Sequence, residues 1–232
     1  MNLLRALAAS FSYFSILPIR HSDEAPSSDA IALLPIVGLV IGGLAGLGAY
    51  GVWLLTQSTI ATAIVAWILS IALSGAIHVD GFLDCCDGLF AMASPQRRLE
   101  IMRDPHHGTY AIVGMAMISA LWLYALAQIP AVMLLAVLPF TGIFARYGAV
   151  LGRQPRVIIP GLVFGILAVY ELPAYRWGVL AAIVLAAVVA FAVEAFARRR
   201  LGGILSGDCY GAAIVVTEVG LLLAYPALMR LQ

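Results

Sequence analysis

Charged side chains are scarce in this sequence. Only 11% of the 232 residues are Asp, Glu, Lys or Arg, whereas 63% are hydrophobic, and the mean hydropathy is +1.02. A water-soluble globule of this length needs more polar residues to cover its surface. The composition therefore excludes a soluble domain and indicates a protein whose main solvent is lipid.

Cysteine and strand-like alternation are also rare. The three cysteines are Cys85, Cys86 and Cys209, an odd number with two adjacent, which suits neither a disulfide framework nor a Cys-x-x-Cys zinc site. We expect reduced thiols on a cytoplasmic face. Membrane β-strands alternate apolar and polar residues, whereas a segment such as Ala181–Ala192 is apolar on all sides. This excludes a barrel and leaves helices, because a lipid-exposed backbone must satisfy its own hydrogen bonds.

Long apolar runs, by contrast, recur along the whole chain. A spanning helix needs about 20 mostly apolar residues, so the runs predict an all-α polytopic bundle in which residues 1–232 form a single integral membrane domain. We predict an apolar helix over Met1–Ile19, spanning the bilayer or lying in its interface. The predicted spans cover residues 30–55, 59–79, 109–128, 131–151, 157–172, 177–197 and 210–229. In the first span, the small residues Gly38, Gly42, Gly43 and Gly46 favour close helix packing.

Lysine is absent, so the orientation of the chain depends on its arginines. When the predicted spans alternate, the loops that hold most of the arginines fall on one side, which the positive-inside rule assigns to the cytoplasm. These residues are Arg20, Arg97, Arg98, Arg103, Arg153, Arg156, Arg198, Arg199 and Arg200, whereas Arg176 and Arg230 lie opposite. Most of the aspartates lie in or beside the same loops, so we expect an active site on the cytoplasmic face.

Three aspartates, Asp80, Asp84 and Asp87, lie where the second predicted span runs into its loop. On a helix these positions fall within about 60° of one another, so their carboxylates share one face. Carboxylates that close repel unless a cation lies among them. Hard oxygen donors favour magnesium, which takes further ligands from phosphate and water. The alternative is an ordinary solvated helix end, but ionisable residues beside an apolar span are costly and usually functional.

Other positions could complete such a site. Arg103 and Asp104 precede a predicted span and could bind a phosphate and a metal, or they could merely anchor the topology. Arg146 lies inside an apolar span and either reaches the membrane edge or faces a polar cavity, the option that we favour. The glycine-rich run 202–212 leads into the last span. Its backbone amides can bind phosphate, or Ser206 or Asp208 can simply cap the helix.

These separated motifs resemble the cobalamin synthase family in order and spacing. His78–Gly88 is similar to the family's His-x-Asp-Gly start with further aspartates. Ile101–Asp104 is similar to its Ile-Met-Lys/Arg-Asp motif, and Gly202–Asp208 is similar to its Gly-Gly-x-Thr-Gly-Asp motif. The early segment Leu34–Gly42 is similar to the family's Leu-Pro-hydrophobic-Val-Gly segment. The chain departs from the pattern at Pro105-His106, where the family often has Ser-Arg, at Ser206, where threonine is usual, and at Val215, where glutamate is common.

The resemblance implies an inner-membrane, magnesium-dependent enzyme that completes the nucleotide loop of cobalamin. Such an enzyme joins adenosylcobinamide-GDP to α-ribazole, or to its 5′-phosphate, and releases GMP. Catalysis of this kind depends mainly on positioning and charge neutralisation. We therefore expect Asp80, Asp84 and Asp87 to hold magnesium on the diphosphate. Asp104 or Asp208 would add a further ligand or accept the proton of the ribazole hydroxyl. Arg103 and Arg146 would neutralise the departing phosphate.

The partners implied are these substrates and membrane lipid, without nucleic acid. Association with further copies of the chain or with other cobalamin-pathway enzymes is compatible with the resemblance. Two rival enzyme classes, the membrane CDP-alcohol phosphotransferases and the prenyltransferases, also bind diphosphates through aspartates, but their motifs fit less well. A cation-coupled transporter would place carboxylates near mid-membrane in several spans, whereas here they concentrate at the cytoplasmic span ends, with Glu194 and Glu218 as the exceptions.

Overall fold

The computed structural model describes residues 3–19, 26–151 and 176–231, and every regular element in these ranges is a helix. This confirms the predicted all-α class. The elements are α1 (Leu3–Phe14), α2 (Ser28–Ala32), α3 (Leu34–Thr56), α4 (Thr59–Leu73), α5 (Ile77–Phe90), α6 (Pro95–Ile101), α7 (Thr109–Ala127), the short 3-10 helix η1 (Ala131–Met133), α8 (Leu134–Leu151), α10 (Arg176–Arg200) and α11 (Gly207–Leu228).

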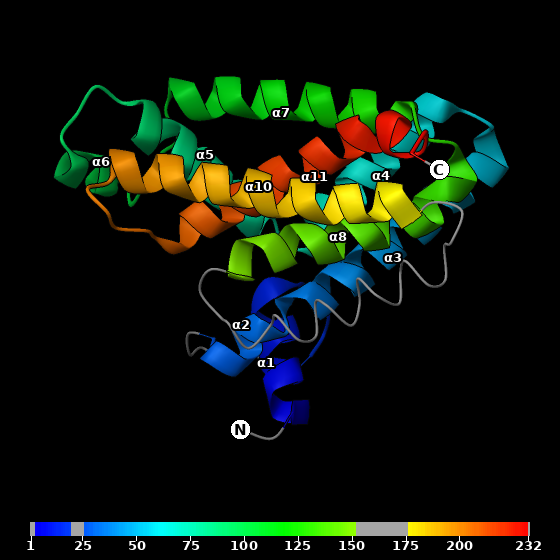
Figure 1. Cartoon of the computed structure of the whole chain (residues 1–232), viewed down its shortest axis with the longest axis horizontal. Helices are drawn as coiled ribbons and strands as arrows, with labels where there is room; N and C mark the ends of the chain where they lie inside the picture. The colour runs from blue at the N-terminus through cyan, green and yellow to red at the C-terminus, as the bar shows by residue number, and fades with distance from the viewer. Residues whose placement is uncertain (1–2, 20–25, 152–175, 232) are drawn as a thin grey trace.

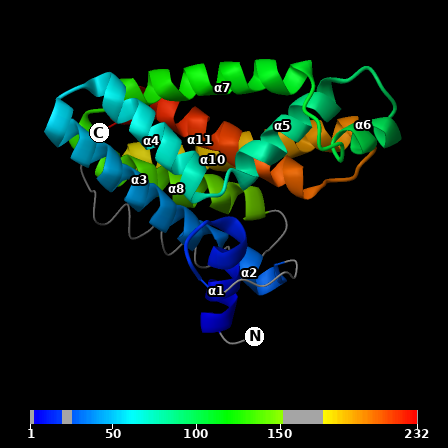
Figure 2. The same ribbon diagram turned by 180° about the vertical axis from the view of Figure 1, so that it is seen from behind.

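The long helices form an elongated bundle around α11 (Figure 1). Helix α11 packs against α5, α7, α8 and α10, and α3 packs against α4 and α8. Buried apolar side chains, among them Trp122, Leu126 and Leu222, fill the space between these helices. Both views show α1 and α2 projecting from one long side of the bundle, whereas α6 and the start of α11 gather at one end (Figures 1 and 2).

Five helical stretches among the described residues are long and apolar enough to cross a bilayer: α3, α7, η1 with α8, α10 and α11. They correspond to the predicted spans at 30–55, 109–128, 131–151, 177–197 and 210–229, and the chain is therefore a polytopic membrane protein. The predicted span at 157–172 lies outside the described residues. Helix α1 has 12 residues, about 18 Å of helix, which is shorter than the ~30 Å hydrocarbon core.

The predicted span over residues 59–79 is broken in the structure. Helix α4 ends at Leu73 and α5 begins at Ile77, with a bend of 90° between them. Gly75 and Ala76 adopt φ values of 62° and 58°, and a right-handed helix cannot continue through positive φ. The amide of Ile16 donates a hydrogen bond of 3.0 Å to the Leu73 carbonyl. The break in the helix is thus tied to the segment that follows α1.

The predicted close packing of glycines joins α3 to α8. A Cβ atom on Gly38 would collide with the carbonyl of Gly142, and one on Gly42 would collide with the carbonyl of Leu138. Gly46 approaches Leu134 in the same way, whereas a Cβ on Gly43 would meet nothing within 4 Å. One stripe of α3 is therefore a backbone-to-backbone contact, and Gly43 lies outside it.

Two arginine-rich segments predicted to share one side of the membrane do meet in the structure. Arg98 Nη1 on α6 donates a hydrogen bond of 2.7 Å to the Leu89 carbonyl, and Arg200 Nε at the end of α10 donates to the same carbonyl at 2.8 Å. These bonds satisfy a carbonyl that the end of α5 leaves without an intrahelical partner. The two arginines therefore hold the ends of α5, α6 and α10 together.

Candidate active site

The candidate site is built where α5 crosses the start of α11. An added Cβ on Gly81 would lie 2.8 Å from the Cα atom of Asp208, and one on Gly211 would lie 3.1 Å from the carbonyl oxygen of His78. Glycine at both positions lets the two backbones approach this closely. The approach places the predicted third motif directly beside the predicted aspartate helix.

Two of the predicted magnesium ligands face a shared histidine. His107 Nε2 lies 3.7 Å from Oδ1 of Asp80, and His107 Nδ1 lies 3.9 Å from Oδ1 of Asp84. Asp84 is also within electrostatic reach of Asp208. Among the described residues, neither Asp80 nor Asp84 forms an ion pair with an arginine. The structure thus brings Asp80, Asp84, Asp208 and His107 into one cluster, which we call the carboxylate cluster.

Asp87 lies on the same helix but is engaged elsewhere. Its Oδ2 accepts a hydrogen bond of 2.6 Å from the amide of Gly108, and its Oδ1 accepts one of 3.0 Å from the amide of Ala111. These amides belong to the first turn of α7, whose N-cap Gly108 has no side chain to offer. Asp87 therefore caps α7 from a distant position in the sequence, and its role as a metal ligand stays a prediction.

The two charged residues of the second motif, Arg103 and Asp104, are exposed at the same end of the bundle. The Asp104 carboxylate accepts hydrogen bonds of 3.0 Å from the amide of His106 and 2.8 Å from its Nδ1. The bonds from the His106 backbone and side chain lower the pKa of Asp104, which makes this carboxylate a weaker base than an ordinary aspartate. Arg103 is exposed and forms no ion pair with any described residue.

Arg146 does not join the carboxylate cluster. Its side chain is buried inside the bundle, where Nη1 lies 2.6 Å from Oε1 of Glu218. Arg146 is buried in the bundle, and the polar cavity that it was predicted to face stays a prediction. Its predicted contact with a departing phosphate stays a prediction.

The start of α11 leaves its backbone amides available. Ser206 occupies the N-cap position, but its side chain makes no capping hydrogen bond; its Oγ lies 3.4 Å from Sγ of Cys209 instead. Gly202 and Gly203 in the preceding turn have φ values of 66° and 93°, which other residues rarely adopt. Cys85, Cys86 and Cys209 are all free and buried.

Within the described ranges, no three His, Cys, Asp or Glu side chains already surround a single metal position. The donors nevertheless suit magnesium, because Asp80, Asp84 and Asp208 offer hard oxygens, and this ion takes several ligands from water and phosphate. Water or the oxygens of a bound diphosphate would complete the coordination shell.

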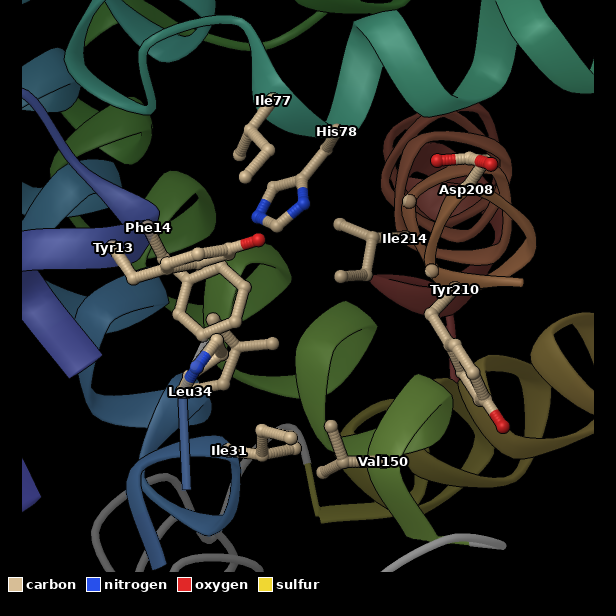
Figure 3. Close-up of a pocket in the computed structure, with 13 residues that line it drawn as sticks. Tyr13, Phe14, Ile31, Leu34, Ile77, His78, Val150, Asp208, Tyr210 and Ile214 are labelled. Atoms are coloured by element: carbon tan, nitrogen blue, oxygen red, sulfur yellow. The ribbon is translucent and has the colours of Figure 1, made fainter. Parts of the chain in front are cut away.

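Sequence reasoning missed a cavity beside the cluster. The cavity has a volume of ≈ 310 Å³ and lies between α1, α2, α5 and the start of α11, with His78 and Asp208 in its wall (Figure 3). Tyr13 and Phe14 of α1 contribute to the same wall. No motif links α1 to the aspartate helix, so the primary sequence carries no signal for this contact.

Comparison with known proteins assigns the chain to a family. The family model described as cobalamin-5-phosphate synthase matches residues 6–226. An adenosylcobinamide-GDP ribazoletransferase from Deinococcus radiodurans is 34% identical over 93% of this chain and 83% of its own length. The enzyme of that name from Corynebacterium efficiens is 30% identical over 91% of this chain and 87% of its own length. The enzyme of that name from Desulfitobacterium hafniense is 28% identical over 98% of this chain and 99% of its own. No solved structure matches. The chain therefore belongs to the cobalamin-5-phosphate synthase family.

Proposed function

We propose that this protein is an adenosylcobinamide-GDP ribazoletransferase, which joins adenosylcobinamide-GDP to α-ribazole or its 5′-phosphate and releases GMP. The observation that carries the proposal is the family match over residues 6–226. The carboxylate cluster beside the start of α11 supports it, because a diphosphate can be held there by a divalent ion and by backbone amides. Neither the CDP-alcohol phosphotransferases, the prenyltransferases nor a transporter is favoured by this match.

The reaction forms one phosphoester bond and breaks another. A ribose hydroxyl oxygen of α-ribazole attacks the phosphorus bound to cobinamide, the bond from that phosphorus to the bridging oxygen of the diphosphate breaks, and GMP leaves with that oxygen. The hydroxyl loses one proton, which Asp208 is placed to accept at the border between the cluster and the cavity. Asp104 is less suited to this task, since its pKa is lowered.

Asp80 and Asp84 would hold magnesium with the diphosphate, which leaves the Asp208 carboxylate free to accept the proton. The ion would neutralise charge that develops on the phosphoryl oxygens during the transfer. His107 lies between Asp80 and Asp84 and positions their carboxylates. The exposed Arg103 is available to bind the GMP phosphate. Asp87 supports the site indirectly, by fixing the start of α7 beside His107.

The proposed location is the inner membrane, with the carboxylate cluster on the cytoplasmic side. The positive-inside rule supports this orientation, since Arg98 and Arg200 meet at the end of the bundle that holds α5 and α6. Both substrates would then reach the site from the cytoplasm. Membrane lipid would surround the apolar helices. Contacts with other copies of the chain or with other cobalamin-pathway enzymes can be sought in native membranes.

The test is product formation by the purified protein in proteoliposomes. Adenosylcobinamide-GDP and α-ribazole are supplied with and without magnesium, and cobalamin and GMP are measured. We expect magnesium-dependent release of GMP, with a loss of at least 100-fold in Asp84→Asn, because electrostatic groups of this kind typically contribute about 10²–10³ in kcat. Glu100→Gln is the matched control, since Glu100 is an exposed carboxylate on α6 that pairs with Arg97. A folded native protein that releases no GMP would reject the proposed function.

A further inference from the structure

The cavity beside the carboxylate cluster has mostly apolar walls. Phe14, Ile31, Leu34, Ile77 and Ile214 line it, and its volume is ≈ 310 Å³. Pockets for small organic ligands span about 300–1,000 Å³ and are mostly apolar with a few polar groups. The cavity thus has room for one aromatic nucleoside and is much too small for a corrinoid ring.

A buried histidine points into this cavity with one ring nitrogen unpaired. The His78 side chain projects from α5 into the space between Phe14 and Ile214 (Figure 3). The residue is 6% exposed, and its Nε2 atom has no hydrogen-bond partner among the described residues. A buried polar atom left unpaired costs free energy. A ligand with a nitrogen or hydroxyl group at this position would remove that cost.

The aromatic side chains arrange the cavity for a flat ligand. The Phe14 and His78 rings are stacked, with centroids 6.1 Å apart and an angle of 23° between their planes. Tyr13 stands edge-on to Phe14 at 4.9 Å, and Figure 3 shows its hydroxyl directed toward His78. Flat heteroaromatic rings pack well beside such faces and edges.

One residue borders both the cavity and the cluster. Asp208 lines the cavity, and its backbone touches α5 at Gly81, one helical turn before Asp84. A ligand whose aromatic part lies near His78 and whose sugar lies near Asp208 would therefore present a hydroxyl to the carboxylate cluster. The carboxylate of Asp208 and the unpaired nitrogen of His78 make the cavity a poor fit for a lipid acyl chain, which offers them no polar group.

We propose that this cavity binds the nucleoside acceptor, with its dimethylbenzimidazole base between α1, α2 and α5, a polar atom bonded to His78 Nε2, and its ribose at Asp208. The inference rests on the proposed function. It assigns α1 to substrate binding, and it separates the nucleoside site from the site of the diphosphate substrate.

The first test measures binding of α-ribazole to the full chain in lipid nanodiscs, without magnesium and without adenosylcobinamide-GDP. Isothermal calorimetry gives the Kd for the native protein, His78→Gln, Ile31→Trp and Ile112→Trp. Ile31→Trp adds bulk to the cavity wall, whereas Ile112 is exposed on α7 and serves as the matched control. We expect native binding, at least tenfold weaker binding in His78→Gln and Ile31→Trp, and no change in Ile112→Trp.

The base itself gives a second readout. Because the walls are apolar, the benzimidazole riboside that lacks both methyl groups should bind roughly tenfold more weakly than α-ribazole, as expected for two buried methyl groups. Equal binding of the two ribosides, no binding to the folded native protein, or native-like Kd values in both cavity variants would overturn the proposal.

Turnover separates this proposal from the proposed function. In an active preparation, Ile31→Trp should raise the KM for α-ribazole at least tenfold and leave the KM for adenosylcobinamide-GDP unchanged. Binding of α-ribazole without GMP release would support the cavity and reject the transferase reaction. GMP release with an unchanged KM for α-ribazole in both cavity variants would support the reaction and reject the cavity.

Discussion

Arg146 Nη1 lies 2.6 Å from Oε1 of Glu218, so an ion pair joins α8 to α11 inside the bundle. The two side chains are 2% and 13% exposed, and Arg146 Nη1 also donates to the Gly142 carbonyl at 3.1 Å. The space beside them is ≈ 10 Å³, which is about the minimum for one water molecule. No phosphate fits there, so in this structure the pair connects helices and does not face a substrate.

Removing one member of this pair should destabilise the protein. Arg146→Leu or Glu218→Leu leaves a buried charge without its partner, a loss typically of about 3–5 kcal/mol. The double variant removes both charges and should recover most of that loss. The stability of the native protein, both single variants and the double variant is compared by thermal unfolding in the same detergent. Strictly additive losses in the double variant would contradict the interpretation.

The glycine stripe of α3 predicts a contrast between neighbouring positions. Gly42→Ala places a Cβ atom against the Leu138 backbone, which cannot move without shifting α8, so we expect a loss of about 1–3 kcal/mol. Gly43→Ala meets nothing within 4 Å and should leave the unfolding temperature unchanged or slightly raised. The two substitutions are chemically identical, so equal effects would show that α3 and α8 do not pack through this stripe.

Asp87 and Asp84 should respond differently to substitution. Asp87→Ala removes the acceptor for the amides of Gly108 and Ala111 and should cost about 0.5–2 kcal/mol, the usual range for loss of a helix cap. Asp84→Ala removes a carboxylate that lies near others and should not lower stability. Parallel unfolding curves and GMP-release rates distinguish the two. A destabilised Asp84→Ala with a stable Asp87→Ala would reverse our assignment of capping and binding roles.

The loop after α6 should lose stability in acid. The pKa of Asp104 is lowered by hydrogen bonds from His106, so the folded state favours the ionised carboxylate. Its contribution is fully present above the pKa of an unfolded aspartate, about 3.9, and is lost as the pH falls through the lower folded value. Asp104→Asn should therefore increase proteolysis of this loop at pH 7, and this effect should shrink as the pH falls below about 3.9. An effect that grows toward acid would contradict this sign.

Sequence reasoning identified the main elements because lipid restricts the choice. Only helices and closed barrels satisfy the backbone within the bilayer, and the residue pattern excludes a barrel. Apolar length therefore predicted α3, α7, α8, α10 and α11 without knowledge of their packing. It failed at the α4–α5 bend, where Gly75 and Ala76 take positive φ. The Ser74-Gly75 pair is a turn signal that hydropathy averaging conceals, because the flanking residues are equally apolar.

The candidate site was only partly predictable. The shared face of Asp80 and Asp84 follows from helical periodicity, which the sequence contains directly. The use of Asp87 as a cap for α7 could not be deduced, because it depends on how α5 and α7 pack. The cavity that His78 lines could not be deduced either, because its wall combines residues of α1, α2, α5 and α11.

The sequence by itself determined that this is a helical membrane protein of a known family, with carboxylates and arginines at one end of the bundle. Those properties depend on composition, local periodicity and motif spacing, which can be read from the order of the residues without knowing how the helices pack. Only the tertiary structure decided that Arg146 pairs with Glu218, that Asp208 approaches Gly81, and that α1 closes a cavity over His78. Each of these contacts joins residues distant in sequence and therefore depends on how the helices pack. Where Asp208 approaches Gly81, the absence of a side chain on the glycine lets the two backbones come together.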